Sequence, residues 1–137
     1  MPSLDEILDD FEYLEEDLER LRYVVDLGKD LPELPEDLRN ETTFVRGCTS
    51  QVWLVPRVEA GDPPTYHFRA DADAQIVRGL VALLLEVYSG KTADQLLSFD
   101  IDGLMMRLRL RQQLTPGRQN GLVAMVNRIR SYAESSG

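Results

Sequence analysis

The sequence predicts an α+β fold: a small three-stranded antiparallel sheet (a meander) packed against several helices in a single domain, residues 1–137. Three observations support this prediction. The chain has 137 residues, 43% of them apolar, which suits one domain with one core. Apolar residues recur at three- and four-residue intervals near both ends, as in amphipathic helices. Residues 42–69 are rich in β-branched and aromatic residues separated by turn signals.

The first forty residues predict helix followed by a connector. Ser3 and Glu6 form a capping-box signature at the start of the chain. The apolar stripe that follows fits one helix, or two helices with a break near residues 12–16. Gly28 is expected to end this helical region. Residues 29–41 are expected to be extended, because their two prolines lack amide donors.

The sheet is expected from three short segments. Residues 42–45, 51–55 and 65–69 each have the composition of a strand. The tight turn between the first two contains Gly47, which supplies the backbone freedom that such a turn needs. Cys48 is therefore expected at the tip of a hairpin.

Two helices are expected after the sheet. Asp71 or Asp73 is placed to cap the first, and Gly90 to end it. Thr92 and Gln95 form another capping-box signature and predict a short second helix.

The last third of the chain is less uniform. Asp100 and Asp102 are interpreted as cap and turn carboxylates. Residues 103–113 fit both a strand alternation and a helical spacing. Thr115 and Pro116 predict the start of the last helix, with a threonine cap and proline in the first helical position.

Charge is distributed unevenly along the chain. The net charge is −9, yet residues 1–41 hold fifteen acidic and four basic residues, while residues 42–137 have a slight basic excess. A nucleic acid partner is not expected, because the phosphate backbone requires a basic face. The acidic segment is expected either to steer a basic protein partner or to form a solvated helix face.

Targeting signals are not expected. The N-terminus is acidic and lacks the basic and apolar regions of a secretory signal. The longest apolar run, residues 80–85, is too short to span a bilayer. The sequence therefore predicts a cytoplasmic protein that does not engage a membrane.

Cys48 is the only cysteine, and this restricts the available chemistry. A lone thiol excludes an internal disulfide and a cysteine-rich metal site, so no metal is expected. A reactive Cys48 would have to exchange with sulfur on another molecule. Arg46, two residues away, is placed to favour its thiolate form. The alternative is an inert, buried cysteine, because cysteine is among the most buried residue types.

Other catalytic pairs have little support. His67 is the only histidine, and nothing local favours its pairing with Cys48 or with Ser50 as in a hydrolase. Arg118 lies in the first turn of the last predicted helix, where a cation opposes the helix dipole. That position suggests another role, such as pairing with a carboxylate or an anionic sulfur, although a solvent-exposed side chain also explains it.

Four segments carry a resemblance to a known family. The segment Gly47-Cys48-Thr49-Ser50-Gln51-Val52-Trp53 closely resembles the Gly-Cys-x-Ser-x-Val-Trp motif of the SufE family of sulfur acceptors. Residues 27–32, 71–80 and 114–122 are similar to the family's connector, helix-opening segment and last helix start, in that order. The resemblance runs from Leu4 to Tyr132. Thr49, where glutamine is common in the family, is a mild departure.

The resemblance implies a function as well as a fold. It favours helix for residues 103–113. It implies that Cys48 accepts persulfide sulfur from a cysteine desulfurase (SufS-like or CsdA-like), stimulates that enzyme, and passes the sulfur to an iron–sulfur scaffold complex. Pyridoxal phosphate would belong to the desulfurase, so the protein has no cofactor of its own and is a co-substrate rather than a self-sufficient enzyme. The alternative is a non-catalytic interaction module with an inert, buried Cys48.

The resemblance also suggests roles for the residues around Cys48. The supporting loop residues are Gly47, Ser50 and Gln51. An apolar shelter for the sulfur is expected from Val52, Trp53 or the last helix. Contacts to the thiolate or to a partner are expected from Arg46, Arg118, Asp71 and Asp73.

Overall fold

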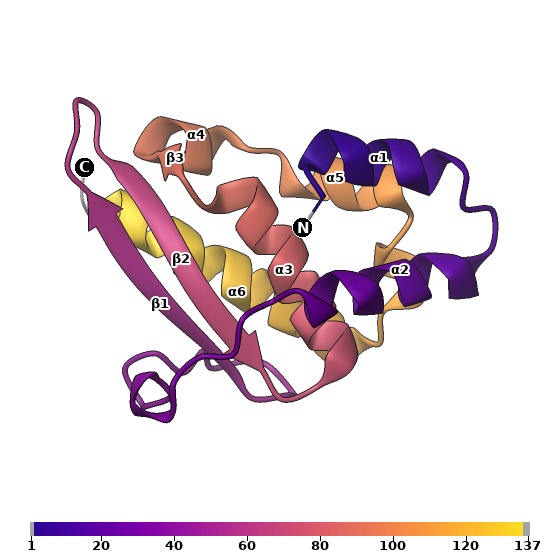
Figure 1. The fold of residues 1–137 in the computed structure, drawn as a ribbon, viewed down its shortest axis with the longest axis horizontal. Coiled ribbons are helices and arrows are strands. Elements are labelled where there is room, and N and C mark those ends of the chain that lie inside the picture. The colour runs from indigo at the N-terminus through magenta and orange to yellow at the C-terminus, as the bar shows by residue number, and fades with distance from the viewer. Residues whose placement is uncertain (1, 136–137) are drawn as a thin grey trace.

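The structure is a computed structural model and describes residues 2–135 (Figure 1). The expected α+β class, with helices packed against a three-stranded antiparallel sheet, is confirmed. The α-helices are α1 (Leu4–Glu12), α2 (Asp17–Lys29), α3 (Gln75–Tyr88), α4 (Ala93–Ser98), α5 (Ile101–Leu108) and α6 (Pro116–Ser135). The strands are β1 (Val52–Glu59), β2 (Thr65–Ala72) and β3 (Lys91–Thr92), and single 3-10 turns cover Glu36–Leu38 and Arg111–Gln113.

The strands of the sheet are not all the expected ones. β1 and β2 form a long hairpin, paired from Val52 opposite Ala72 to Glu59 opposite Thr65. β3, which follows α3, adds a third strand beside β2. The strand predicted over residues 42–45 is wrong: this segment makes only one bridge, between Phe44 and Trp53.

Local hydrogen bonds explain why residues 42–45 do not form a strand. The Asn40 side chain accepts bonds from the amides of Thr42 and Thr43, at 2.9 and 3.1 Å. The Thr43 hydroxyl donates to the Leu38 carbonyl at 2.6 Å. These side-chain bonds hold a turn, which competes with the strand that the β-branched residues favour.

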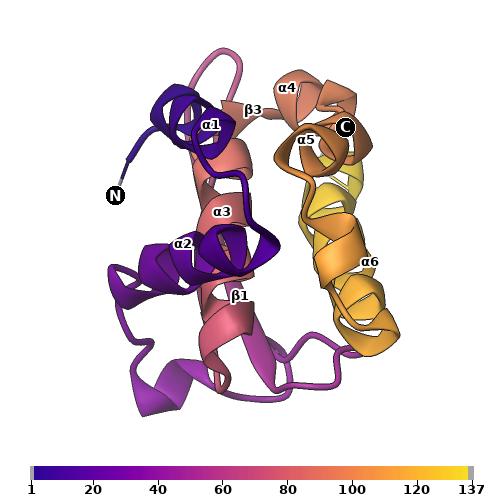
Figure 2. The same cartoon turned by 90° about the vertical axis from the view of Figure 1, so that its right-hand side faces the viewer.

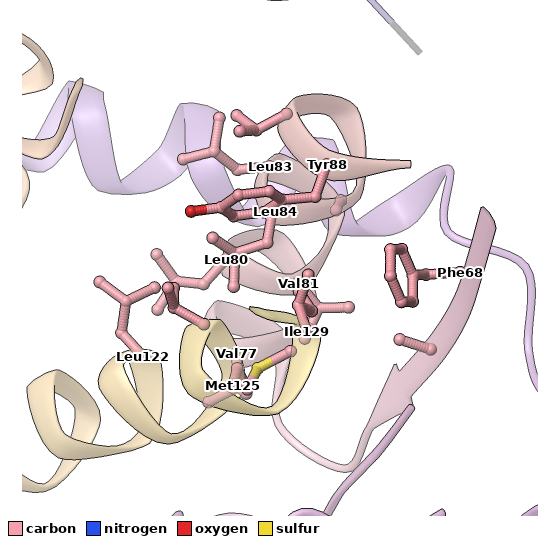
Figure 3. Packing of buried hydrophobic residues seen from close by; sticks show 14 of the residues in the cluster. Phe68, Val77, Leu80, Val81, Leu83, Leu84, Tyr88, Leu122, Met125 and Ile129 are labelled. Carbon is pink, nitrogen blue, oxygen red and sulfur yellow. The ribbon is translucent and has the colours of Figure 1, made fainter. Parts of the chain in front are cut away.

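α3 lies at the centre of the molecule. It contacts β2 on one side and α2 and α6 on others, so the sheet covers one face of a helical layer (Figures 1 and 2). The side chains of α3 interdigitate with those of α6 in a continuous apolar core (Figure 3). Among the described residues, no helix combines the length and hydropathy needed to cross a membrane.

The helical region ends one residue after Gly28, close to the expected stop, but Gly28 itself is not a cap residue. It lies inside α2, which continues to Lys29. A Cβ atom at Gly28 would lie 2.6 Å from the amide nitrogen of Gly79 in α3, and one at Gly79 would lie 2.0 Å from the carbonyl oxygen of Val24 in α2. The two glycines therefore allow the backbones of α2 and α3 to pack in direct contact.

Several helix boundaries agree with the sequence. The break between α1 and α2 is confirmed, as are the side-chain cap by Ser3 and the capping box of Thr92 and Gln95. Asp100 caps α5 by accepting a bond from the amide of Gly103 at 3.0 Å. Helix in the ambiguous region is confirmed as far as Leu108, where α5 ends.

The expected caps of α3 are wrong. Its N-cap is Ala74, and it has no side-chain cap. Asp71 belongs to β2, and Asp73 bonds to the cysteine loop instead.

Candidate functional site

Cys48 lies in a loop at the end of the sheet. The amide of Val45 donates to the carbonyl of Val52 at 2.8 Å, and the loop of residues 46–51 joins these two positions. The expected placement of Cys48 at a hairpin tip therefore agrees with the structure, although one side of the hairpin is only a bridge. Gly47 has a φ of +95°, a left-handed conformation that glycine adopts without strain.

The far end of the loop is held by Asp73. Its carboxylate accepts a bond from the amide of Gln51 at 3.0 Å, and its own amide donates to the carbonyl of Gln51 at 3.1 Å. These two bonds connect the loop to the junction between β2 and α3. Asp73 thus has a structural role in the loop and does not contact the thiol through any of these bonds.

The cysteine segment, residues 42–49, runs antiparallel along one face of α6. Small residues line this face. A Cβ at Gly117 would lie 2.6 Å from the Thr49 methyl, and one at Gly121 would lie 3.4 Å from the Cys48 sulfur. A Cβ at Gly47 would in turn lie 3.2 Å from the Cβ of Ala124. The loop can therefore rest on the helix backbone itself.

The Cys48 thiol is half-buried against this helix. Its Sγ atom lies 3.6 Å from the carbonyl oxygen of Gly121, within reach of a weak S–H donor. Burial raises the pKa of the thiol above its usual value. This direction is opposite to the one expected from Arg46, whose side chain is exposed. At rest, the site therefore favours the neutral thiol.

A small apolar cavity adjoins the sulfur. Its volume is about 20 Å³, which is enough for one water-sized atom. Residues of α3 and α6 form its apolar wall, and four of them also pack together in the core (Figure 3): Val77, Leu80, Leu122 and Met125. The last helix thus lines the apolar space beside the sulfur, where one of the expected alternatives placed a shelter.

The other two expected shelter residues do not line this cavity. Val52 is fully buried in the main core. Trp53 lies under the guanidinium of Arg39, with 5.1 Å between the guanidinium carbon and the ring centroid, and meets Phe44 edge-on. The expectation that Val52 or Trp53 shelters the sulfur is therefore wrong.

Arg118 borders the cavity, on the first turn of α6. Its backbone amide donates to the Thr115 hydroxyl at 3.3 Å. Within residues 2–135, its guanidinium makes no hydrogen bond or ion pair. It is therefore free to bind an anionic group brought close to Cys48. Ser50 also lines the cavity, while Gln51 and Arg46 are exposed at the loop surface.

Asp71 is not available to a thiolate or a partner, contrary to expectation. It is fully buried, and it accepts bonds from Arg39 at 2.6 Å, from the Leu34 amide at 3.0 Å, and from Arg78. Arg78 also donates to the Leu31 carbonyl at 2.6 Å. This ionic cluster fixes the connector of residues 29–41, which precedes the cysteine segment, to β2 and α3.

His67 lies at the opposite end of the sheet from Cys48. Its Nε2 atom is 3.0 Å from the Thr65 hydroxyl and 3.0 Å from the Glu59 carboxylate. Ala72, at the cysteine end, lies five positions further along β2 than His67, a span of about 16 Å. The side chains of His67 and Cys48 therefore do not form a catalytic pair. Within residues 2–135, no three His, Cys, Asp or Glu side chains are grouped so that they could hold a metal ion.

Sequence reasoning missed the small-residue face of α6 and the α3 wall of the cavity. A signal for the first was present, because Gly117, Gly121 and Ala124 recur at helical spacing. Two glycines inside a helix lower its stability, so their presence indicates a close backbone approach. The α3 residues carry no comparable signal, since their apolar spacing is that of any core helix.

Fold and site together define a class: a small α+β domain that holds one half-buried thiol on a loop resting against a helix. The family model for the SufE Fe-S metabolism associated domain matches residues 5–133. A SufE-like protein of Rhizobium etli is 48% identical over 98% of this chain and 91% of its own length. Another from Rhizobium meliloti is 45% identical over 98% and 96%. The chain belongs to the SufE family.

A solved structure supports the fold alone. The solution structure of a hypothetical protein from Thermus thermophilus superposes with a TM-score of 0.74, covering 96% of this chain and 93% of that one. Its sequence identity is 22%. The arrangement of elements is therefore shared at low sequence identity.

Proposed function

We propose that this protein accepts sulfur from a cysteine desulfurase as a persulfide on Cys48 and delivers it for iron–sulfur cluster assembly. Membership of a family associated with Fe-S metabolism supports the pathway. The observation that carries the proposal is the setting of Cys48: a lone thiol on a loop, half-buried beside a cavity with room for about one atom. A persulfide adds one sulfur atom to the thiol, and the cavity is of that order in size.

The proposed reaction is an exchange at sulfur. The Cys48 thiolate attacks the outer sulfur of the desulfurase persulfide, a new S–S bond forms at Cys48, and the desulfurase cysteine leaves as a thiolate. The proton lost by Cys48 goes to solvent or to the departing thiolate. Pyridoxal phosphate acts on the desulfurase, of the SufS or CsdA type, and this protein supplies only the acceptor. Removal of the persulfide frees the enzyme for another turnover, which is how the acceptor would stimulate it.

The resting site favours protection over reaction. A persulfide is readily oxidised or attacked by other thiols, so a carrier benefits from apolar cover between partners. The same burial raises the pKa of Cys48 and limits access to its sulfur. Acceptance therefore requires the loop to leave α6 when the desulfurase docks. The guanidinium of Arg118, which has no bonding partner within residues 2–135, is suited to bind an anionic group at that stage. The cytoplasm, where thiols stay reduced, is the proposed location.

The test is direct transfer. The protein is incubated with the desulfurase, pyridoxal phosphate and cysteine, and its intact mass is measured before and after treatment with a reductant. The expected result is a reductant-sensitive gain of one or more sulfur atoms on Cys48, and none on a folded Cys48→Ser variant. Retained acceptance by Cys48→Ser would contradict the proposal. No gain with an active desulfurase, together with a thiol that resists labelling until unfolding, would favour the interaction module with an inert cysteine.

A further inference from the structure

Arg128 connects α6 to the beginning of the cysteine segment. Its side chain extends from the face that carries Gly121 and Ala124, one helical turn beyond Ala124. Its Nη1 atom donates to the carbonyl of Phe44 at 3.2 Å, and its Nη2 atom donates to the carbonyl of Thr42. Both acceptors precede the loop that holds Cys48. Arg128 thus binds the chain just before it reaches the thiol.

The guanidinium is itself held in place by a neighbour on the same helix. Its Nε atom donates to the Tyr132 hydroxyl at 2.9 Å, and the guanidinium carbon lies 5.8 Å from the centroid of the same ring. Both Nη groups are thereby aimed at the cysteine segment. An arginine oriented in this way loses little side-chain freedom when it binds the two carbonyls.

The remaining contacts between the segment and α6 are weaker. Gly47, Cys48 and Thr49 meet small residues of the helix by van der Waals contact. The sulfur makes one weak bond, at 3.6 Å, to the Gly121 carbonyl. Hydrogen bonds from a charged donor are roughly twice as strong as those between neutral groups. The strongest hydrogen bonds between α6 and this segment are therefore those of Arg128.

We propose that Arg128 is a positioning residue for Cys48: its two bonds set how often the cysteine segment leaves α6, and hence how fast the thiol can react. The inference rests on the proposed function only for the reason that such a device is useful, since a carrier needs both shelter and release. The predicted change in thiol reactivity is a property of the protein alone, without a partner. Loss of both bonds raises the fraction of molecules in which the cysteine segment has left α6 by about tenfold or more, and the rate of thiol modification rises by the same factor.

The helix supplies a matched control. Arg130 lies two residues further along α6 and donates to a carbonyl as well, that of Leu97 in α4, at 3.0 Å. Replacing either arginine by methionine removes one charge and its donors while retaining an apolar stem. Only Arg128→Met releases the cysteine segment. A general loss of stability or of positive charge affects both variants.

The experiment measures the alkylation of Cys48 by iodoacetamide, a neutral reagent, across a pH series, with thermal unfolding recorded for each variant. Arg128→Met is expected to react about tenfold faster than the parent at pH 8, with its pH midpoint shifted toward that of an ordinary thiol. Arg130→Met is expected to match the parent in both. Arg128→Lys, which keeps the charge on a single donor nitrogen, is expected to react at an intermediate rate and provides the comparison if the methionine variant does not fold.

Two results would overturn the proposal: a folded Arg128 variant that reacts at the parent rate, or an equal acceleration in Arg130→Met. Neither measurement involves a desulfurase. Faster alkylation of Arg128→Met combined with failure of sulfur transfer would therefore refute the proposed function and leave the positioning role intact.

Discussion

Replacing Asp71 by asparagine tests whether the buried ionic cluster stabilises the fold. The substitution retains the size of the side chain and removes its charge. In the parent protein, one carboxylate oxygen of Asp71 accepts bonds from Arg39 and the Leu34 amide, and the other accepts a bond from Arg78. Asparagine offers one acceptor oxygen and one NH₂ group. Whichever way it is oriented, an amide donor faces other donors on one side.

The magnitude follows from burial. Removing one partner of a buried ion pair costs about 3–5 kcal/mol, because the remaining charge is left without compensation. The Arg39 and Arg78 side chains are 32% and 21% exposed, so water partly solvates them after the substitution. The expected loss for Asp71→Asn is therefore near the lower end, about 3 kcal/mol. A domain with about 5–15 kcal/mol of stability remains folded in buffer.

Urea unfolding, with the midpoint and slope fitted separately, provides the measurement. The matched control is Asp26→Asn. Asp26 pairs with Lys29 at 2.9 Å, but both side chains are about two-thirds exposed, at 67% and 70%. The control is expected to lose about 0.5 kcal/mol or less. If Asp71→Asn cost no more than Asp26→Asn, the desolvation of the three charges would cancel their attraction, and the argument for a stabilising cluster would fail.

Three further predictions follow from the packing and charge of the site. Gly79→Ala should destabilise the fold by about 2 kcal/mol or more by forcing two helix backbones apart, whereas Gly121→Ala should stay within about 1 kcal/mol, both read from urea midpoints. The pH at which alkylation of Cys48 reaches half its maximal rate should be higher in the folded protein than in an unfolded control, because burial raises the pKa of the thiol; equal midpoints would refute this. Since the folded state then keeps the thiol proton to higher pH, the stability of the protein relative to Cys48→Ser should fall as pH rises from the ordinary to the raised pKa. Because Arg46 and Arg118 are on or beside the cysteine loop, an anionic methanethiosulfonate should react at least about fivefold faster than a cationic one at low salt, with the preference lost in 1 M salt; a preference for the cation would contradict it.

The helices were predictable because their determinants are local. The cap by Ser3, the capping box at Thr92 and the cap by Asp100 each involve residues three apart in the sequence. The apolar spacing in α3 and α6 is equally local. Such signals do not depend on where other parts of the chain lie.

The errors arose where distant contacts decide the outcome. Gly28 has the sequence context of a helix end, yet its role depends on Gly79, fifty-one residues later. Asp71 has the context of a cap, yet its partners include Arg39, thirty-two residues earlier. The failed strand at residues 42–45 is different, because its turn is built from near neighbours. There, hydrogen bonds to the Asn40 side chain outweighed β propensity, which is a weak preference.

The candidate site divides in the same way. The cysteine and its loop were visible in the sequence, and so was the role of Gly47, because a tight turn has a local signature. The cavity was not, because it requires two helices separated in the sequence by β3, α4 and α5. The position of Arg128 against Thr42 and Phe44 links residues more than eighty apart, and only the packing of α6 on this segment brings them together.

Glycine on the helix reconciles the two demands that a carrier thiol faces. A seat built from long side chains would interlock with the loop, and each withdrawal would open a cavity and expose apolar surface. Because the loop rests on Gly117 and Gly121, it can separate from the helix without disturbing interdigitated side chains. The stronger bonds lie on either side of Cys48, from Arg128 to Thr42 and Phe44 and between Asp73 and Gln51, and do not involve the sulfur itself. For the proposed carrier, shelter and release would then be adjusted separately: the small cavity would determine how well the sulfur is covered, and the bonds of Arg128 and Asp73 how often it emerges.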